Sequence, residues 1–279
     1  MLWLDPAPLQ AEIGKAYRNY HTHGVSRVRT PVVLWLAALN AMCRLANKPV
    51  ALLSGFDAQR RHLRKMYLGD VPPGRLLEIG CGGGRYLNRM RRAGWQVEGI
   101  EPDLAAASRV RDRYSIEVRP DLFAEHYPDA AFDAVVMSHV IEHVHDPLAL
   151  MRECRRVLRP NGFLVVTTPN ARSAAHMKYA RCWRGLEPPR HIHLFAPEAL
   201  RKCAEMAGFE TRRLFTTAVG AAGMYRSSDK ICEKETGLSS TTSESISVLR
   251  SWLRQYRELR DIAANANAGQ NLVLIAARA

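Results

Sequence analysis

The stretch Leu76-Leu-Glu-Ile-Gly-Cys-Gly-Gly-Gly-Arg-Tyr-Leu-Asn88 decides the fold that this sequence predicts. It joins a short apolar run, typical of a buried strand, to an amphipathic segment through a cluster of glycines. Glycine has no Cβ, so the backbone at these positions can turn sharply and come close to a ligand. The stretch therefore predicts a strand, a ligand-binding turn and a helix, in that order.

The alternation of strand and helix continues along the chain. Short runs rich in Val, Ile and Leu alternate with amphipathic stretches, which favours a parallel sheet covered by helices. Strands are expected at 75–80, 96–101, 116–119, 132–138, 162–168, 209–217 and 271–277, and helices at 85–93, 103–114, 147–158, 197–207 and 246–266. The interruption at about 170–196 is long for a connection within a compact domain, so it predicts a functional insertion.

The glycine spacing distinguishes two classes of nucleotide-binding turn. A dinucleotide fingerprint requires G-x-G-x-x-G/A, but Arg85 occupies the place of its third small residue. What remains is E-x-G-x-G-x-G, with Glu78 on the strand followed by Gly80, Gly82 and Gly84. This argues against an NAD-type oxidoreductase, which stays an alternative together with a non-catalytic scaffold.

The E-x-G-x-G-x-G pattern resembles motif I of the class I S-adenosylmethionine-dependent methyltransferases, in particular the type 11/12 and ubiquinone-pathway O-methyltransferase-like group. The likeness runs from about residue 75 to residue 168. It implies a Rossmann-like, doubly wound α/β fold with a seven-stranded sheet whose last strand is antiparallel. It also implies a cofactor-binding domain at 71–279, with a substrate loop at 170–196 and a helical insertion at 220–268, preceded by a helical lid at 1–70.

The resemblance further implies which residues hold S-adenosylmethionine. Glu101 ends the next strand about 20 residues past the glycines, where a ribose-binding acid is expected, and Asp103 is expected to cap the following helix. Asp121 follows the third strand, where such enzymes often have an acid near the adenine, and Glu125 competes for that role. The expected cofactor-binding residues are Glu78, Gly80, Cys81, Gly82, Gly84, Glu101, Asp121, Leu122, Ser138 and His139.

A second motif, H-x-x-E-H, lies in Ser138-His-Val-Ile-Glu-His-Val-His-Asp-Pro147. Inverted zinc proteases use this spacing, but their helix needs several turns and the chain allows about one turn before Pro147 starts a new helix. A zinc protease is therefore not expected. The segment instead resembles the V-L-E-H-V-x-D-P pattern that follows the fourth strand of methyltransferases, beside cofactor and substrate.

The same motif leaves a metal-assisted enzyme as the alternative within the class. The ubiquinone-pathway enzymes carry E-x-x-E-H at this point, a cluster associated with a divalent metal near a catechol substrate. Here His139 takes the first position, so a set of His139, Glu142 and His143 suits Mg²⁺ less well. The favoured interpretation assigns no metal ligand.

The substrate side is predicted in Trp183-Arg-Gly-Leu-Glu-Pro-Pro-Arg-His-Ile-His-Leu-Phe195. A histidine that titrates near neutral pH can accept the proton of a hydroxyl group during methyl transfer. We expect His191 first and His193 second in this catalytic role; the alternative is that both imidazoles only hold the loop through hydrogen bonds. Near the N-terminus, a lid or pocket wall is predicted with Tyr17, Tyr20, His21 and His23; the alternative is that Tyr17 and Tyr20 are ordinary residues of a helix core.

Composition limits the partners. The chain has 279 residues, and its 40 Lys and Arg against 27 Asp and Glu give a net charge of +13. The basic residues are dispersed, without an aromatic-basic RNA-binding pattern or an N-P-P-Y motif, so we expect a small-molecule acceptor, most simply a hydroxyl compound, and no specific nucleic acid.

Location follows from the apolar runs and the cysteines. The apolar run at 31–43 is shorter than the roughly 20 residues of a membrane span, the start lacks a secretory signal, and the six cysteines are scattered. We expect a cytoplasmic enzyme without a transmembrane segment. The basic amphipathic stretch 246–266 leaves a peripheral membrane contact open, and no pattern indicates an oligomeric state.

Overall fold

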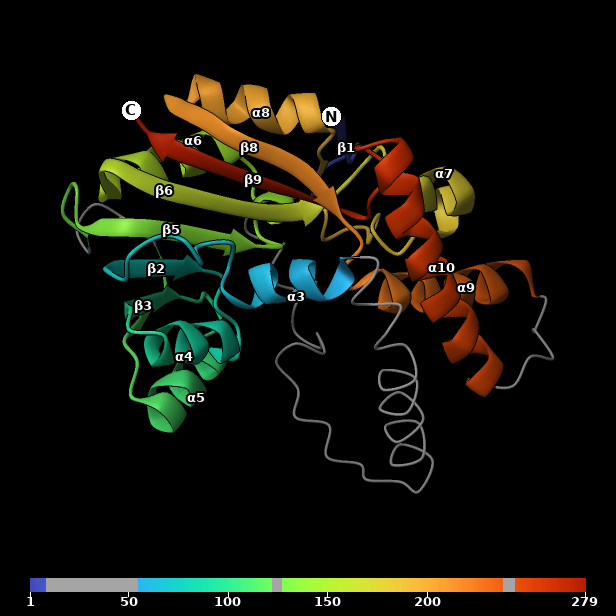
Figure 1. Ribbon diagram of the computed structural model, residues 1–279, viewed down its shortest axis with the longest axis horizontal. Helices are drawn as coiled ribbons and strands as arrows, with labels where there is room; N and C mark the ends of the chain where they lie inside the picture. The colour runs from blue at the N-terminus through green and yellow to red at the C-terminus, as the bar shows by residue number, and fades with distance from the viewer. Residues whose placement is uncertain (9–54, 122–126, 238–243) are drawn as a thin grey trace.

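A computed structural model describes residues 1–8, 55–121, 127–237 and 244–279, and its centre is a seven-stranded sheet (Figure 1). The strand order is β4-β3-β2-β5-β6-β9-β8. The strands are β2 (Arg75–Ile79), β3 (Gln96–Ile100), β4 (Val118–Arg119), β5 (Phe132–Ser138), β6 (Leu158–Pro169), β8 (Phe209–Thr217) and β9 (Asn271–Arg278). Because β9 alone in this sheet runs antiparallel to its neighbours, the predicted Rossmann-like order with an antiparallel last strand is confirmed.

Helices cover both faces of the sheet, so its central strands are apolar on both sides. Leu76 packs into one cluster with Leu87 and Val110, whereas its neighbour Leu77 packs into another with Met151 and Leu200. Successive side chains of a strand point to opposite faces, which explains this division. The helices are α4 (Arg85–Arg92) and α5 (Leu104–Tyr114) on the first face, and α6 (Pro147–Val157) and α8 (Pro197–Met206) on the second (Figure 1).

Local capping sets the starts of two of these helices. The Asp103 carboxylate accepts hydrogen bonds from the backbone N–H groups of Ala105 and Ala106, as predicted for the start of α5. The Asp146 carboxylate accepts one from Ala149 N, and Pro147 occupies the first turn of α6. Both helices therefore begin directly after a strand or turn at the edge of the sheet where ligands bind in open α/β folds.

One strand is longer than predicted. We expected residues 162–168, but β6 begins at Leu158, because Leu158 pairs with Phe132 before an irregularity and the main register resumes at Phe163. The Arg278 guanidinium donates hydrogen bonds to the carbonyl groups of Arg155 and Arg156 beside this early part of β6. The additional residues at the start of β6 thus lie beside contacts that the C-terminal strand β9 makes with residues far from it in the sequence.

The C-terminal end of the predicted insertion pairs with the N-terminal residues of the chain. The insertion contains α7 (Ala174–Tyr179) and β7 (His193–Leu194), and β7 pairs antiparallel with the N-terminal β1 (Leu2–Trp3). The N-terminal residues therefore border the predicted substrate loop. Of the predicted lid, α3 (Phe56–Arg64) belongs to the described part, whereas Tyr17, Tyr20, His21 and His23 lie outside the described residues.

Two helices separate β8 from β9. They are α9 (Ala221–Thr236) and α10 (Glu244–Ala264), and they pack against each other beside α7 (Figure 1). The Asp229 carboxylate on α9 accepts hydrogen bonds from Tyr179 of α7 and Arg254 of α10. Within the described ranges, no helix is long and apolar enough to cross a membrane.

Candidate functional site

The glycine turn joins β2 to α4 in a conformation that suits glycine. Gly80, Gly82 and Gly84 all have positive φ angles, of 70°, 52° and 66°. A Cβ at Gly80 would lie 2.5 Å from Val140 Cγ2, so the turn packs tightly there. A Cβ at Gly82 or Gly83 would meet nothing within 4 Å. The backbone of this half of the turn therefore faces open space that a ligand can enter.

Glu101 holds the glycine turn from the end of β3. Its side chain is buried, and Oε2 accepts a hydrogen bond of 2.8 Å from the backbone N–H of Gly82. Oε1 accepts one of 3.0 Å from Asp103 N. A carboxylate has about four acceptor positions, so these two bonds leave acceptor capacity for hydroxyl groups of a ligand. This bracing of the turn was not predicted from the sequence.

Glu78 lies in the core directly before the turn. Its carboxyl is buried, and Oε2 has no hydrogen-bond partner in the described structure. Burial raises the pKa of Glu78 to about 8, and the nearby charge of Glu101 adds to this rise. Because one oxygen has no partner, the group has capacity to interact with a polar or cationic ligand.

The other predicted cofactor residues follow neighbouring strands at the same edge. Ile79 pairs with Met137, which brings Ser138 and His139 beside Gly80. Ser138 Oγ accepts a hydrogen bond of 2.8 Å from Thr167 Oγ1. Among the rest, Cys81 is buried, and burial raises the pKa of its thiol, so it is an unreactive packing residue; Asp121 follows β4, and Leu122 and Glu125 lie outside the described residues.

The H-x-x-E-H segment forms a single short turn after β5. The turn is a 3₁₀ helix of three residues, Ile141–His143, too short for the helix of a zinc protease. The Glu142 side chain is fully buried; its Oε1 lies 3.2 Å from His139 Nδ1, and Oε2 accepts a hydrogen bond of 2.9 Å from Thr168 Oγ1. Burial alone would raise the pKa of Glu142, but the bond from His139 and the adjacent imidazoles lower it to about 2.

The insertion brings His191 to this buried carboxylate. The backbone N–H of Ile192 donates to the carbonyl of Glu142 at 2.8 Å, which fixes the loop against the turn. The rings of His143 and His191 meet edge to face with centroids 4.7 Å apart. One ligand atom from each of Glu142, His143 and His191 lies within 4.8 Å of the others. The alternative set weighed from the sequence contained His139; among the described residues, the group that could hold a metal contains His191 in its place.

Hydrogen bonds determine the tautomers of the two imidazoles. His191 Nδ1 lies 2.7 Å from the carbonyl oxygen of Gly185, and His143 Nδ1 lies 3.0 Å from that of Arg190. A carbonyl oxygen only accepts, so both Nδ1 atoms carry the proton, and Nε2 is the basic nitrogen of each neutral ring. Burial lowers the pKa of His191, which favours its neutral form.

His193 does not join this cluster. It lies on β7, where its Nε2 is 3.4 Å from the carbonyl oxygen of His145 and its buried Nδ1 has no partner. Glu187, which we did not predict, approaches His191 instead, with its Oε2 3.6 Å from His191 Nε2. Arg184 and Arg190 both bind the Glu187 carboxylate. The sequence feature that could have indicated Glu187 is its position between two arginines in a loop rich in histidine.

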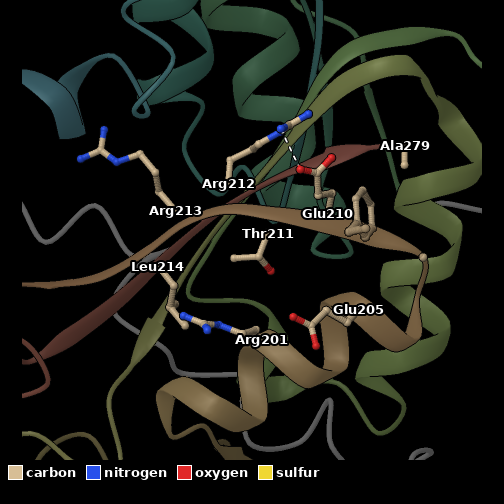
Figure 2. A pocket seen from close by; sticks show the side chains of 10 residues that line it. Arg201, Glu205, Glu210, Thr211, Arg212, Arg213, Leu214 and Ala279 are labelled. Carbon is tan, nitrogen blue, oxygen red and sulfur yellow. Dashed lines mark ion pairs between the residues drawn. The ribbon is translucent and has the colours of Figure 1, made fainter.

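A cavity of about 550 Å³ lies elsewhere, between α8 and the edge strand β8 (Figure 2). Arg212 and Glu210 form an ion pair of 2.7 Å on its wall, and Arg201 and Glu205 line it from α8. None of the residues that line it belongs to the glycine turn or to the histidine cluster. Volume therefore does not identify the candidate site here; the converging polar groups do.

Comparisons with known proteins agree with this geometry. A family model described as a methyltransferase domain matches residues 56–214. The ubiquinone biosynthesis O-methyltransferase of Xanthomonas campestris pv. campestris is 39% identical over 114 residues, which cover 38% of this chain and 47% of that protein. A probable S-adenosylmethionine-dependent methyltransferase of Mycobacterium tuberculosis is 43% identical over 97 residues, covering 34% of this chain and 35% of the relative. The chain thus spans about half the length, or less, of the curated relatives it matches.

Solved structures share the fold. The [4+2]-cyclase SpnF superposes with a TM-score of 0.54 at 22% identity, covering 79% of this chain and 80% of that one. A sarcosine dimethylglycine methyltransferase, described as putative, from Galdieria sulphuraria gives 0.53 at 15% identity, covering 81% and 85%. At these identities the likeness concerns the fold alone.

The buried Glu142 carboxylate predicts a pH dependence of stability. Its pKa falls from the ordinary 4.5 to about 2 on folding, so its contribution is present above pH 4.5 and is lost as the pH falls toward 2. Glu142→Gln should lower the free energy of unfolding at pH 7 by about 1.5 to 3 kcal/mol and reduce the loss of stability between these pH values. Urea unfolding across this range measures both.

The exposed carboxylate of Glu198 offers a matched control. Glu198→Gln should follow the wild-type pH dependence. A Glu142→Gln profile parallel to that of the wild type would contradict the depressed pKa.

The glycine turn braced by Glu101, the polar edge formed after β5 and the antiparallel last strand occur together in one domain. The family model covers more than half of the chain and includes the glycine turn, the H-x-x-E-H turn and the insertion. The chain therefore belongs to the methyltransferase domain family, in the class I group that uses S-adenosylmethionine as methyl donor.

Proposed function

We propose that this protein transfers the methyl group of S-adenosylmethionine to a hydroxyl oxygen of a small-molecule acceptor. The observation that carries the proposal is the neutral, buried imidazole of His191 beside Glu142 and His143, at the same sheet edge as the glycine turn. The similarity to ubiquinone biosynthesis O-methyltransferases over 114 residues supports oxygen rather than nitrogen or carbon as the accepting atom.

The residues at the glycine turn fit the cofactor. Open space at Gly82 and Gly83 accommodates a ligand against the backbone, and the unpartnered oxygen of Glu78 can form a hydrogen bond with a polar group of the ligand. Glu101 would bind the ribose hydroxyls, and Asp121 would approach the adenine. When bound, S-adenosylmethionine supplies a methyl group on a positively charged sulfur, which is open to attack by an oxygen nucleophile.

The chain's own groups would align the acceptor and take its proton. The Gly185 carbonyl holds His191 Nδ1–H, so the basic Nε2 is oriented to accept the hydroxyl proton. The anionic Glu142 stabilises the imidazolium that results, since opposite charges attract strongly in a buried site. The loop fixed by Ile192 N to the Glu142 carbonyl keeps these groups in place, and such alignment accounts for much of the rate.

Cofactor binding tests the role of Glu101. Glu101→Gln removes the charge and the acceptor for Asp103 N but keeps an amide oxygen that can accept the Gly82 hydrogen bond, so the turn should persist while ribose binding weakens. Calorimetric titration should give at least a ~10-fold higher Kd for S-adenosylmethionine and S-adenosylhomocysteine, the size expected when a charged hydrogen bond is lost.

Glu117→Gln is the matched control, because Glu117 is an exposed carboxylate near the same strand ends, bound only to Arg119 in a surface ion pair. Its affinity should equal that of the wild type, and NADH should bind neither protein. Unchanged affinity in a folded Glu101→Gln protein would contradict the assignment.

Turnover tests the proton acceptor. His191→Asn keeps a side-chain N–H near the Gly185 carbonyl but has no basic nitrogen, so we expect turnover to fall by about 10² to 10⁴ with unchanged cofactor affinity. The readout is S-adenosylhomocysteine formation with a panel of phenols, catechols and aliphatic alcohols.

His193→Asn is the comparison variant, since His193 is our second candidate and lies outside the cluster. Loss of turnover in His193→Asn alone would transfer the role to His193. Full turnover in both variants would contradict a histidine base.

The cluster of Glu142, His143 and His191 supports a second candidate function, metal-assisted O-methylation of a catechol-like diol. Two imidazoles and a carboxylate suit Zn²⁺, Mn²⁺ or Fe²⁺ better than Mg²⁺. The carbonyls of Gly185 and Arg190 and the hydroxyl of Thr168 hold these side chains as outer-sphere partners of metal ligands commonly do.

Direct titration with metal ions separates the two functions. If the cluster is a metal site, Zn²⁺ or Mn²⁺ should bind the protein one to one, Mg²⁺ should bind at least ~10-fold more weakly, and His143→Asn should lower the Zn²⁺ affinity by about 10-fold or more. His176→Asn, an exchange at a histidine stacked on Trp183, should leave binding unchanged. Equal Zn²⁺ binding by His143→Asn would contradict the metal site.

A further inference from the structure

Helix α10 exposes an apolar stripe on the outside of the molecule. Ile246, Leu249 and Leu253 are 46%, 49% and 52% exposed. Their spacing of three and four residues puts them on one face of the helix, about one turn apart. Large aliphatic side chains seldom line up on a surface without a partner.

The buried face of α10 is a different one. Val248, Ser251 and Gln255 are almost fully buried, and the buried Glu258 carboxylate accepts a hydrogen bond of 2.6 Å from the backbone N–H of Gln270. These contacts hold the helix against the domain. The exposed stripe is therefore directed away from the core, and the helix cannot bury it by rotation without losing them.

Basic residues continue the same face. Arg250, Arg257 and Arg260 are all exposed, and Arg257 and Arg260 follow Leu253 by one and two turns. Arg260 lies near Asp261, but at 3.8 Å in a surface pair that contributes little. The face thus carries three aliphatic side chains and Arg250 in its N-terminal half and two arginines in its C-terminal half.

A lysine on α7 adds to the positive potential. Partial burial lowers the pKa of Lys178; the charge of Arg254 lowers it further, that of Asp229 opposes this, and that of Arg257 adds to the decrease. Cations from two helices are therefore close enough to repel one another. Arg254 pairs with Asp229, and Arg257 and Arg260 are exposed further along α10. An anionic partner would relieve this repulsion.

We propose that the exposed face of α10, made by Ile246, Leu249, Leu253, Arg250, Arg257 and Arg260, binds to the surface of an anionic lipid bilayer. Aliphatic side chains on one face of such a helix enter the boundary between headgroups and acyl chains, and neighbouring arginines contact lipid phosphates. The net charge of +13 attracts the whole protein to the same surface. The inference goes beyond the proposed methyl transfer and does not depend on it.

Charge argues against a second copy of this chain as the occupant. A symmetric contact between two copies presents the same patch from both sides, so it adds no acidic group from this face that could pair with the arginines. A nucleic acid would use the arginines but leave Leu249 and Leu253 without a role. A bilayer with acidic headgroups accommodates both halves of the face.

Vesicle co-sedimentation of the full chain tests the proposal. Binding to vesicles of phosphatidylcholine mixed with phosphatidylglycerol should be at least ~10-fold tighter than binding to phosphatidylcholine alone, and added salt should weaken it. The double variants Leu249→Ser/Leu253→Ser and Arg257→Gln/Arg260→Gln should each weaken binding to the anionic vesicles by about 10-fold or more. Their melting temperatures should match that of the wild type, because the altered side chains are exposed.

Matched controls come from exposed residues on other elements. Leu104→Ser on α5 and Met206→Ser on α8 remove side chains that are 67% and 56% exposed, and Arg201→Gln/Arg212→Gln removes two charges from the cavity at the sheet edge (Figure 2). These variants should bind like the wild type.

Four outcomes would overturn the proposal. They are no binding to either vesicle, equal binding to both, binding retained by the α10 variants, and a self-association measured by light scattering that Leu249→Ser/Leu253→Ser abolishes while vesicle binding persists.

Discussion

The buried carboxylate of Glu142 is the group on which the arrangement of the candidate site depends. Moving a charged group out of water costs free energy. A buried charge is therefore stable only where hydrogen bonds and opposite charges compensate for that cost. Here the compensation comes from His139 on the same turn and from Thr168 at the end of β6, and the insertion is held to the same residue by the hydrogen bond from Ile192 N to the Glu142 carbonyl. Glu142 therefore joins the turn after β5, the neighbouring strand and the insertion.

A second carboxylate organises the other half of the site. Glu101 receives the backbone N–H groups of Gly82 and Asp103, so it fixes the glycine turn and the start of α5 together. The glycines adopt positive φ angles without steric strain because they have no Cβ. Glu78 differs from Glu101, because burial and the nearby charge of Glu101 raise the pKa of Glu78 and one of its carboxyl oxygens has no partner in the described structure. The site thus combines one well-compensated acid with one that has unused capacity.

The parts that differ from a bare sheet-and-helix domain lie around one end of the sheet (Figure 1). The N-terminal β1 pairs with β7 of the insertion, and α7 contacts α9, which in turn packs against α10. Asp229 binds Tyr179 and Arg254, so three helices from distant parts of the sequence share one carboxylate. This construction supports the insertion from outside while leaving one face of α10 exposed.

Local patterns in the sequence determined the strands of the central sheet and the helices that cover it, the glycine turn and the cap of α5 by Asp103, because each depends on residues within a few positions of one another. The strands β1 and β7 and the helix α7 were not predicted. The sequence also excluded a zinc-protease helix from local information alone, because Pro147 limits the length of the turn after β5. Only the tertiary structure decided that His191, and neither His139 nor His193, completes the set with Glu142 and His143. It also decided that Leu2–Trp3 pairs with the insertion and that β6 begins at Leu158. These are contacts between segments far apart in the chain, and no spacing in a single sequence encodes where an insertion folds back.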